Sequence, residues 1–210
     1  MRRRYSRLYS PEEGGELVRA ARYVVESYVS SAKFSRHIAE ERLEKFNGRH
    51  GLFVTLQHYP TGTLRGCIGF AKPAGPVKTT LVDAAVAAST NDPSFRPISH
   101  MELDHLIAGV SVLLGEPVQV RGSSPLAIRR QIRAGRDGLI LRYGVYGGVL
   151  LPQVARENGW NGEESLSRLC AEAGLERHAW KKPNVSIYRF ESQTFRESSP
   201  RGDVEEVSLQ

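Results

Sequence analysis

The residues with the clearest capacity for chemistry lie in one hexapeptide, Leu64-Arg65-Gly66-Cys67-Ile68-Gly69. A thiol is nucleophilic as the thiolate, and a nearby positive charge favours that form. On a β-strand, Arg65 and Cys67 point to the same face with Cα atoms about 6.5 Å apart. We therefore expect Cys67 to be a catalytic nucleophile or to line a ligand-binding cleft with Arg65. Gly66 and Gly69 are expected to let a ligand approach the backbone. The competing interpretation is a cysteine that fills space in the core.

Two further segments offer polar groups to a site. Asp92 opens the loop Asp92-Pro93-Ser94-Phe95-Arg96-Pro97, where it could turn the chain, accept a proton or pair with Arg65. Gln153 follows Pro152 at an expected helix start, so it could donate to a ligand while the backbone amides hold an anion. Helix capping is the alternative role there. Cys170 lies on an apolar helix face and is expected in the core.

Alternation in the sequence predicts the hairpin that positions the thiol. Residues 52–57 and 64–69 read as strands, and residues 59–63 have turn chemistry. Antiparallel pairing across this turn gives an apolar face and a polar face. We expect the polar face to pair Gln57 with Arg65, Thr55 with Cys67 and Phe53 with Gly69.

Apolar periodicity and breaker residues predict the other elements. Expected helices cover residues 11–31, 36–46, 76–91, 100–105, 125–134 and 153–173, the last interrupted near Gly159 or Gly162. Expected strands cover residues 107–114, a second hairpin at 137–143 and 147–152, and 185–190. The two hairpins look alike and each precedes a helix, which indicates either an old strand–strand–helix repeat or chance similarity. Without long helix–strand alternation, the sequence predicts an α+β fold with antiparallel sheets.

Composition restricts the classes of partner and cofactor. Twenty-nine Lys and Arg against 23 Asp and Glu give a net charge of +6, which favours an acidic partner such as nucleic acid. Four of the cations lie in the first seven residues, however, and elsewhere the two signs are interleaved. The cysteines and histidines lack metal-ligand spacing, and no glycine-rich phosphate loop is present, so we expect no metal and no cofactor.

Targeting signals are missing as well. No apolar run reaches the roughly 18 residues that a membrane helix needs. The basic start, residues 1–7, has no apolar segment behind it. We therefore expect a cytoplasmic protein without a membrane partner.

The hexapeptide resembles the signature of the AMMECR1 family, and further segments follow in that family's order. Residues 92–97 are similar to its D-P-R-F-P-P loop, although Ser94 and Arg96 depart from it. Residues 109–113 resemble its E-V-S-V-L strand, with Gly109 in place of the acidic residue. The match continues through Asp137-Gly138-Leu139-Ile140, residues 150–155, Trp160, Cys170, Ala173-Gly174-Leu175 and Trp180.

This resemblance implies an α+β domain over about residues 11–196, with subdomains at about 11–120 and 121–196. Residues 1–10 are then an N-terminal arm and residues 197–210 a polar tail. The family has no established activity, but its signature segment is suspected to line a functional cleft, which points to Arg65, Gly66, Cys67 and, less directly, Asp92.

Three hypotheses follow for the function. The first is an enzyme that acts on a small-molecule or nucleotide-related substrate through Cys67 and Arg65. The second is a non-catalytic binding or adaptor module for a protein or an RNA. In the third, the signature serves folding alone, and Cys67→Ala then costs stability without loss of any ligand.

Overall fold

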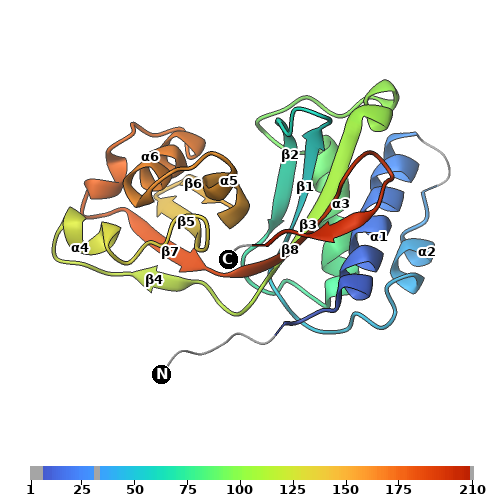
Figure 1. Ribbon diagram of the computed structural model, residues 1–210, viewed down its shortest axis with the longest axis horizontal. Coiled ribbons are helices and arrows are strands. Elements are labelled where there is room, and N and C mark those ends of the chain that lie inside the picture. The colour runs from blue at the N-terminus through green and yellow to red at the C-terminus, as the bar shows by residue number, and fades with distance from the viewer. Residues whose placement is uncertain (1–6, 31–33, 209–210) are drawn as a thin grey trace. The chain divides into compact units, whose positions relative to one another are not determined.

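A computed structural model describes residues 7–30 and 34–208, which form two compact units. The first unit combines the chain up to Leu114 with Gln193–Val207, and the second contains Gly115–Ser192. Each unit has one antiparallel sheet with helices against it (Figure 1). The predicted α+β fold class is therefore confirmed.

The first unit is built on a five-stranded sheet with the order β2-β1-β3-β8-β9. Its strands are β1 (Leu52–His58), β2 (Leu64–Phe70), β3 (Leu106–Leu113), β8 (Ser192–Glu197) and β9 (Val204–Glu206). Its helices are α1 (Pro11–Val29), α2 (Arg36–Glu41), α3 (Val77–Thr90) and the 3-10 helix η1 (His100–His105). Helices α1 and α3 bury their apolar sides together with one face of this sheet.

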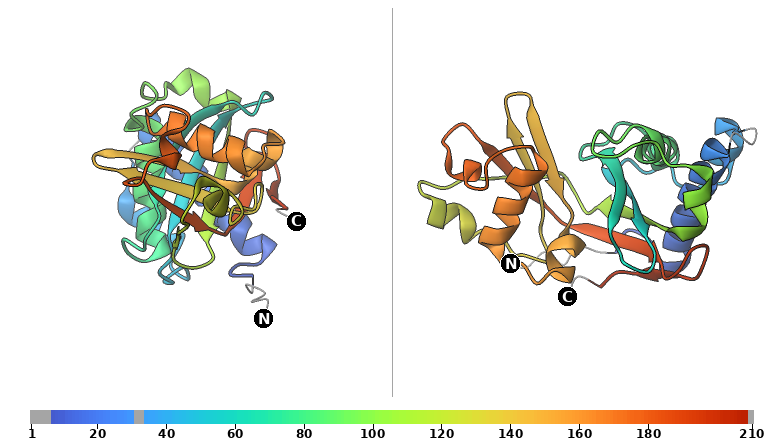
Figure 2. Two further views of the ribbon diagram at one scale, coloured as in Figure 1. Left: turned by 90° about the vertical axis from the view of Figure 1, so that its left-hand side faces the viewer. Right: turned by 90° about the horizontal axis from the view of Figure 1, so that it is seen from above.

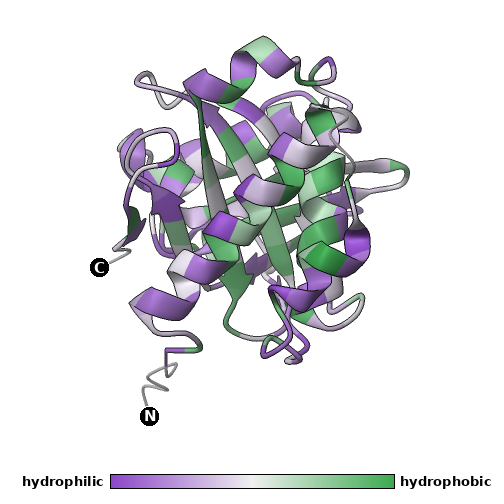
Figure 3. Ribbon diagram, turned by 90° about the vertical axis from the view of Figure 1, so that its right-hand side faces the viewer, coloured by the Kyte–Doolittle hydropathy of each residue, from purple (hydrophilic) through white to green (hydrophobic). Residues whose placement is uncertain are grey.

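Helix α1 starts where the sequence predicts. The Ser10 hydroxyl accepts from the Glu13 amide (3.2 Å), and the Glu13 carboxylate accepts from the Ser10 amide (2.8 Å). This reciprocal capping box satisfies two amides that a helix start otherwise leaves without partners. The buried stripe of α1 begins at Leu17, while polar residues lie on its outer side (Figure 3). Tyr28 of α1 and Ile38 of α2 are exposed despite their apolar side chains.

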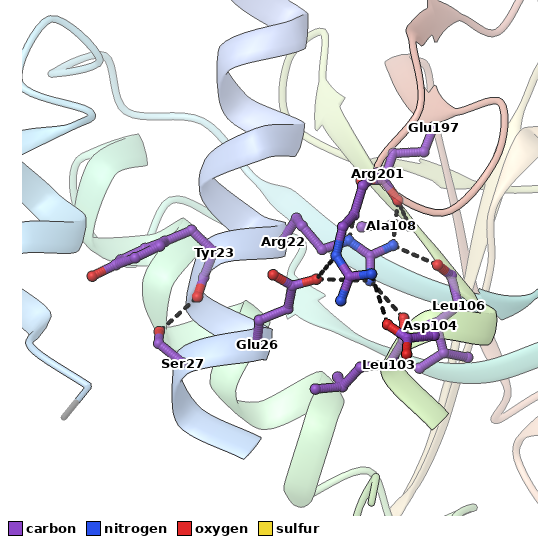
Figure 4. Close-up of polar contacts among 10 residues, drawn as sticks. All are labelled: Arg22, Tyr23, Glu26, Ser27, Leu103, Asp104, Leu106, Ala108, Glu197 and Arg201. Atoms are coloured by element: carbon purple, nitrogen blue, oxygen red, sulfur yellow. Dashed lines mark hydrogen bonds and ion pairs between the residues drawn. The ribbon is translucent and has the colours of Figure 1, made fainter. Parts of the chain in front are cut away.

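One charged residue interrupts the apolar stripe of α1. Arg22 is buried and donates to both carboxylate oxygens of Glu197 on β8. It also donates to the carbonyl oxygens of Leu103 and Leu106, while Glu197 accepts from the amide of Ala108 at 2.9 Å (Figure 4). Because both charges have several hydrogen-bonding partners, this ion pair is stable inside the unit.

The end of the chain differs from the expected polar tail. Glu197 is buried, and residues beyond it turn at Arg201 to form β9, which pairs with β8. The sequence around β8 and β9 is polar because their partners are polar, namely Arg22 for Glu197 and Ser111 for Thr194 (2.9 Å). Such distant partners leave no local signature in the sequence.

The second unit has a four-stranded sheet with the order β4-β7-β5-β6. Its strands are β4 (Val118–Val120), β5 (Gly138–Tyr143), β6 (Tyr146–Leu150) and β7 (Ser186–Phe190). Its helices are α4 (Pro125–Arg129), α5 (Pro152–Glu157), α6 (Gly162–Glu172) and the 3-10 helix η2 (Ala179–Lys181). The β5–β6 hairpin projects beyond its neighbours (Figure 2), and Val145 at its tip is almost fully exposed.

The expected helix over residues 153–173 is interrupted, as predicted. Helix α5 ends before Gly159, which has a φ of +65° that few side chains tolerate. Helix α6 then begins after Asn161, whose side chain accepts from the amides of Glu163 and Glu164. Among the described residues, no helix is both long enough and apolar enough to span a membrane.

Candidate functional site

The β1–β2 hairpin follows most of the predicted register. Thr55 lies opposite Cys67 as expected. Beyond Leu56 the register shifts, so that Gln57 lies opposite Leu64 and Arg65 is an extra residue of β2. The predicted pairing of Gln57 with Arg65 is therefore wrong. A bulge of this kind redirects one side chain of a strand.

The redirected Arg65 holds the loop that follows α3. Its Nε donates to Glu102 (2.7 Å), and its Nη2 reaches the second carboxylate oxygen (3.3 Å). Its other contacts are the carbonyl oxygens of Arg96 (2.9 Å) and Pro97 (3.4 Å). The guanidinium also lies 5.8 Å from the ring centre of Phe95. Because these bonds occupy every guanidinium nitrogen, Arg65 acts here as a clamp on residues 95–97.

Asp92 attaches the same loop to the outer edge of β2. One carboxylate oxygen accepts from the amide of Cys67 (2.8 Å), and the other accepts from the amide of Ser94 (2.9 Å). The alternative of an Asp92–Arg65 pair is wrong, since the carboxylate partner of Arg65 is Glu102. Strand β2 is at the edge of the sheet, where amides otherwise face away from any strand partner. The buried Asp92 carboxylate covers this edge at Cys67.

The Cys67 thiol has a defined position on the sheet. It is partly buried, and its sulfur lies 3.5 Å from Oγ1 of Thr55. Since the Cys67 amide points outward to Asp92, Thr55 and Cys67 form a non-hydrogen-bonded pair, the type in which side chains lie closest. Alternation places the sulfur on the face away from α3, because the preceding residue, Gly66, meets α3.

The two glycines of the hexapeptide lie close against neighbouring backbone. A Cβ on Gly66 would lie 2.3 Å from the carbonyl oxygen of Ala88 in α3. A Cβ on Gly69 would lie 2.1 Å from the carbonyl oxygen of Leu52. Neighbouring backbone fills both spaces, so Gly66 has a packing role between β2 and α3, and its ligand-binding role stays a prediction.

Glu102 is the residue of this cluster that the sequence analysis missed. The hydrogen bond from Arg65 and those from Ser99 lower the pKa of Glu102 from 4.5 to about 2, against a smaller opposing effect of burial. The Ser99 amide and hydroxyl donate to Glu102 at 2.8 and 2.9 Å at the start of η1. A Ser-x-x-Glu pattern before a short helix is a recognisable capping signal and could have identified it.

The remaining candidates lie in the second unit. Gln153 occupies the second position of α5 and is buried, and its binding role stays a prediction. Cys170 is fully buried in α6, as predicted, and burial raises the pKa of its thiol. Within residues 7–30 and 34–208, no three His, Cys, Asp or Glu side chains are arranged to hold a metal.

The signature hexapeptide, the loop and the capping serine thus form one connected cluster in the first unit. A model of the AMMECR1 family matches residues 18–195. The chain belongs to the AMMECR1 family. Protein MJ0810 of Methanocaldococcus jannaschii is 44% identical over 203 residues, covering 97% of this chain and 99% of that one. A protein of Thermofilum pendens is 41% identical over 210 residues, covering 96% and 97% of the two chains.

A solved structure of the same family supports the fold. The crystal structure of uncharacterized protein PH0010 from Pyrococcus horikoshii matches with a TM-score of 0.81 and 38% sequence identity. The match covers 92% of this chain and 96% of that chain. In this AMMECR1 protein, the signature hexapeptide is strand β2, and the loop at residues 92–97 is the segment that Asp92 and Arg65 fasten to it.

Proposed function

We propose that this AMMECR1 protein is an enzyme that acts on a small-molecule or nucleotide-related substrate, with Cys67 as its nucleophile. The supporting observation is the fixed place of the thiol. Its sulfur lies 3.5 Å from the Thr55 hydroxyl, and its own backbone amide is bound by Asp92 at 2.8 Å. A nucleophile held in one geometry reacts with a bound substrate without a further entropic cost of orientation.

Each residue of the cluster has a separate part in this proposal. The Cys67 thiolate attacks an electrophilic carbon of the substrate, forming a carbon–sulfur bond while the leaving group departs with its electron pair. The thiol proton passes to water beforehand. Asp92 and Arg65 act as positioning residues, because their side chains hold residues 92–97 beside the thiol strand. Thr55 orients the sulfur.

Alkylation by iodoacetamide as a function of pH tests the nucleophile. Mass spectrometry of the digested protein reports labelling of Cys67 and Cys170 separately, so no variant is needed. We expect iodoacetamide to label Cys67 in the folded protein, and faster at higher pH because the thiolate is the reacting form. Cys170 should stay unlabelled in the folded protein because it is buried. Protection of Cys67 from alkylation in the folded protein contradicts the nucleophile.

A second candidate is a binding module that uses the same surface without chemistry. One observation favours it: both oxygens of Asp92 already accept hydrogen bonds from backbone amides, so this carboxylate is not placed to act as a base for Cys67. Protein purified from its native host distinguishes the two candidates by mass spectrometry. A covalent adduct on Cys67 supports the enzyme. The same non-covalent ligand on the wild type and on Cys67→Ser supports the binding module.

A further inference from the structure

A row of exposed or partly exposed residues crosses the sheet of the second unit. Ser186 on β7 lies opposite Arg142 on β5, and Arg142 in turn lies opposite Gly147 on β6. The β4–β7 register, continued by one residue, places Arg121 beside Ser186. From edge to edge, the row is Arg121, Ser186, Arg142 and Gly147. None of these residues belongs to the proposed thiol site, so this surface is an independent feature.

The row lies on the face of the sheet opposite the one that α6 covers, with Arg121 and Arg142 exposed and Ile140 and Phe190 buried on that same face. Leu141 belongs to the core that α6 covers, so its neighbour Arg142 points to the opposite face. Tyr188 lies opposite Ile140 on that same face, two residues after Ser186 along β7. The Arg142 guanidinium carbon is 5.8 Å from the centre of the Tyr188 ring. A cation and an aromatic ring are therefore presented together.

The charge of this surface is positive and is not neutralised by carboxylates. Within the described part of the chain, neither Arg121 nor Arg142 forms an ion pair with Asp or Glu. Arg121 donates to the side-chain oxygen of Gln119 at 3.2 and 3.1 Å. Residues 115–192 contain twelve Lys and Arg against eight Asp and Glu, a net charge of +4. A polyanion is the complementary partner.

We propose that single-stranded RNA binds across this row. Arg121 and Arg142 bind successive phosphates, and an unstacked base lies on Tyr188 and the Arg142 guanidinium plane. Neighbouring strands are about 4.8 Å apart, so the two arginines start roughly 10 Å apart and their long side chains can span a short stretch of backbone. The Ser186 hydroxyl lies between them, and the Gln119 amide lies beside Arg121 on β4; both groups suit the 2′-hydroxyl groups of RNA.

Fluorescence anisotropy with the full chain and a labelled dodecamer of uridine tests this binding site. We expect the double variant Arg121→Gln/Arg142→Gln to bind at least tenfold more weakly than the wild type at 50 mM salt. Loss of two phosphate contacts should also reduce the slope of log affinity against log salt by about 1.4. The matched control is Arg130→Gln/Arg177→Gln, which removes the same charge from exposed positions of the same unit and should change affinity less than about twofold.

Substitution of Tyr188 separates the contribution of base stacking to RNA affinity from the contribution of charge. Tyr188→Phe keeps the ring and should retain affinity, whereas Tyr188→Leu should lose about tenfold, the usual effect of removing one stacked base. A dodecamer of deoxythymidine lacks the 2′-hydroxyls and should bind several-fold more weakly. The proposal is overturned by no wild-type binding at low salt, by equal losses in the control double variant, or by equal affinity for the DNA. Circular dichroism confirms that each variant is folded.

Discussion

Among the individual residues, Glu102 is kept ionised by the hydrogen bonds it accepts. Its pKa is lowered from 4.5 to about 2, chiefly by Arg65. A carboxyl with a depressed folded-state pKa stabilises the protein fully above its unfolded pKa. This contribution is lost as the pH falls from about 4.5 through about 2.

The substitution Glu102→Gln should therefore destabilise the protein at neutral pH and matter less in acid. We expect a loss of roughly 1–2 kcal/mol at pH 7, since one pKa unit corresponds to about 1.36 kcal/mol and partial exposure screens the pair. Urea denaturation at several pH values between 7 and 2.5 measures the difference from the wild type. That difference should shrink below about pH 4.5. The exposed Glu116→Gln serves as control, and a difference that is constant with pH contradicts the prediction.

Gly66→Ala tests whether the signature glycine is required for packing. Its Cβ would lie 2.3 Å from the Ala88 carbonyl oxygen, so we expect a loss of about 1–3 kcal/mol in the free energy of unfolding. Gly147→Ala is the matched control in an edge strand, because its nearest neighbour would be 3.7 Å away. It should change stability by less than about 0.5 kcal/mol. Equal stabilities of the two variants would show that α3 can move away from β2 without loss of unfolding free energy.

For individual residues, part of the candidate site could be predicted from the sequence. Period-two alternation placed Cys67 opposite Thr55, because that pairing depends only on the turn and the strand. The bulge at Arg65 could not be predicted, since its partner Glu102 lies 37 positions further along the chain. The packing of Gly66 could not be predicted for the same reason, because the backbone beside it belongs to α3.

Among the secondary-structure elements, the loop at residues 92–97 and strand β2 stabilise one another. The edge of β2 is covered where Asp92 binds the Cys67 amide, and an uncovered edge is a site for unwanted strand pairing. Asp92→Ala should leave two amides without their carboxylate partner and cost about 1–3 kcal/mol.

Hydrogen exchange shows which segments of the chain the substitution Asp92→Ala affects. We expect faster exchange in peptides that contain β2 and residues 92–97, with α1 unchanged. Asp83→Ala, which removes an exposed carboxylate paired with Arg36, is the control and should leave β2 exchange as in the wild type. Unchanged β2 exchange in Asp92→Ala would mean that the loop is held by Arg65 alone.

Elements with local signals were predicted well and elements with distant partners were not. Helix α1 has Ser10, Pro11 and two acidic residues at its start, and the break between α5 and α6 has a glycine with positive φ. By contrast, β8 and β9 are polar strands whose partners lie far away in the sequence. The local sequence pattern therefore indicated a polar tail at residues 197–210 instead of two strands.

In the whole molecule, the Arg22–Glu197 pair joins the two ends of the first unit. Glu197→Gln removes one buried charge and leaves Arg22 uncompensated, so we expect a loss of about 3–5 kcal/mol in unfolding free energy. Arg201→Gln breaks only exposed pairs with Glu26 and Asp104 and should cost less than about 1 kcal/mol. Thermal and urea denaturation measure both variants. Similar losses in the two would contradict the special role of the buried pair.

The first unit is built from two separate stretches of the chain, which affects how it folds during synthesis on the ribosome. Helix α1 is made early, yet Glu197, the partner of its buried arginine, is translated roughly 80 residues after Leu114. At 5–20 residues per second, this interval lasts about 4–16 s. During that time the β3 edge and the Arg22 guanidinium of the nascent chain stay open to water and to chaperones. The second unit is encoded within that interval, as the single stretch Gly115–Ser192.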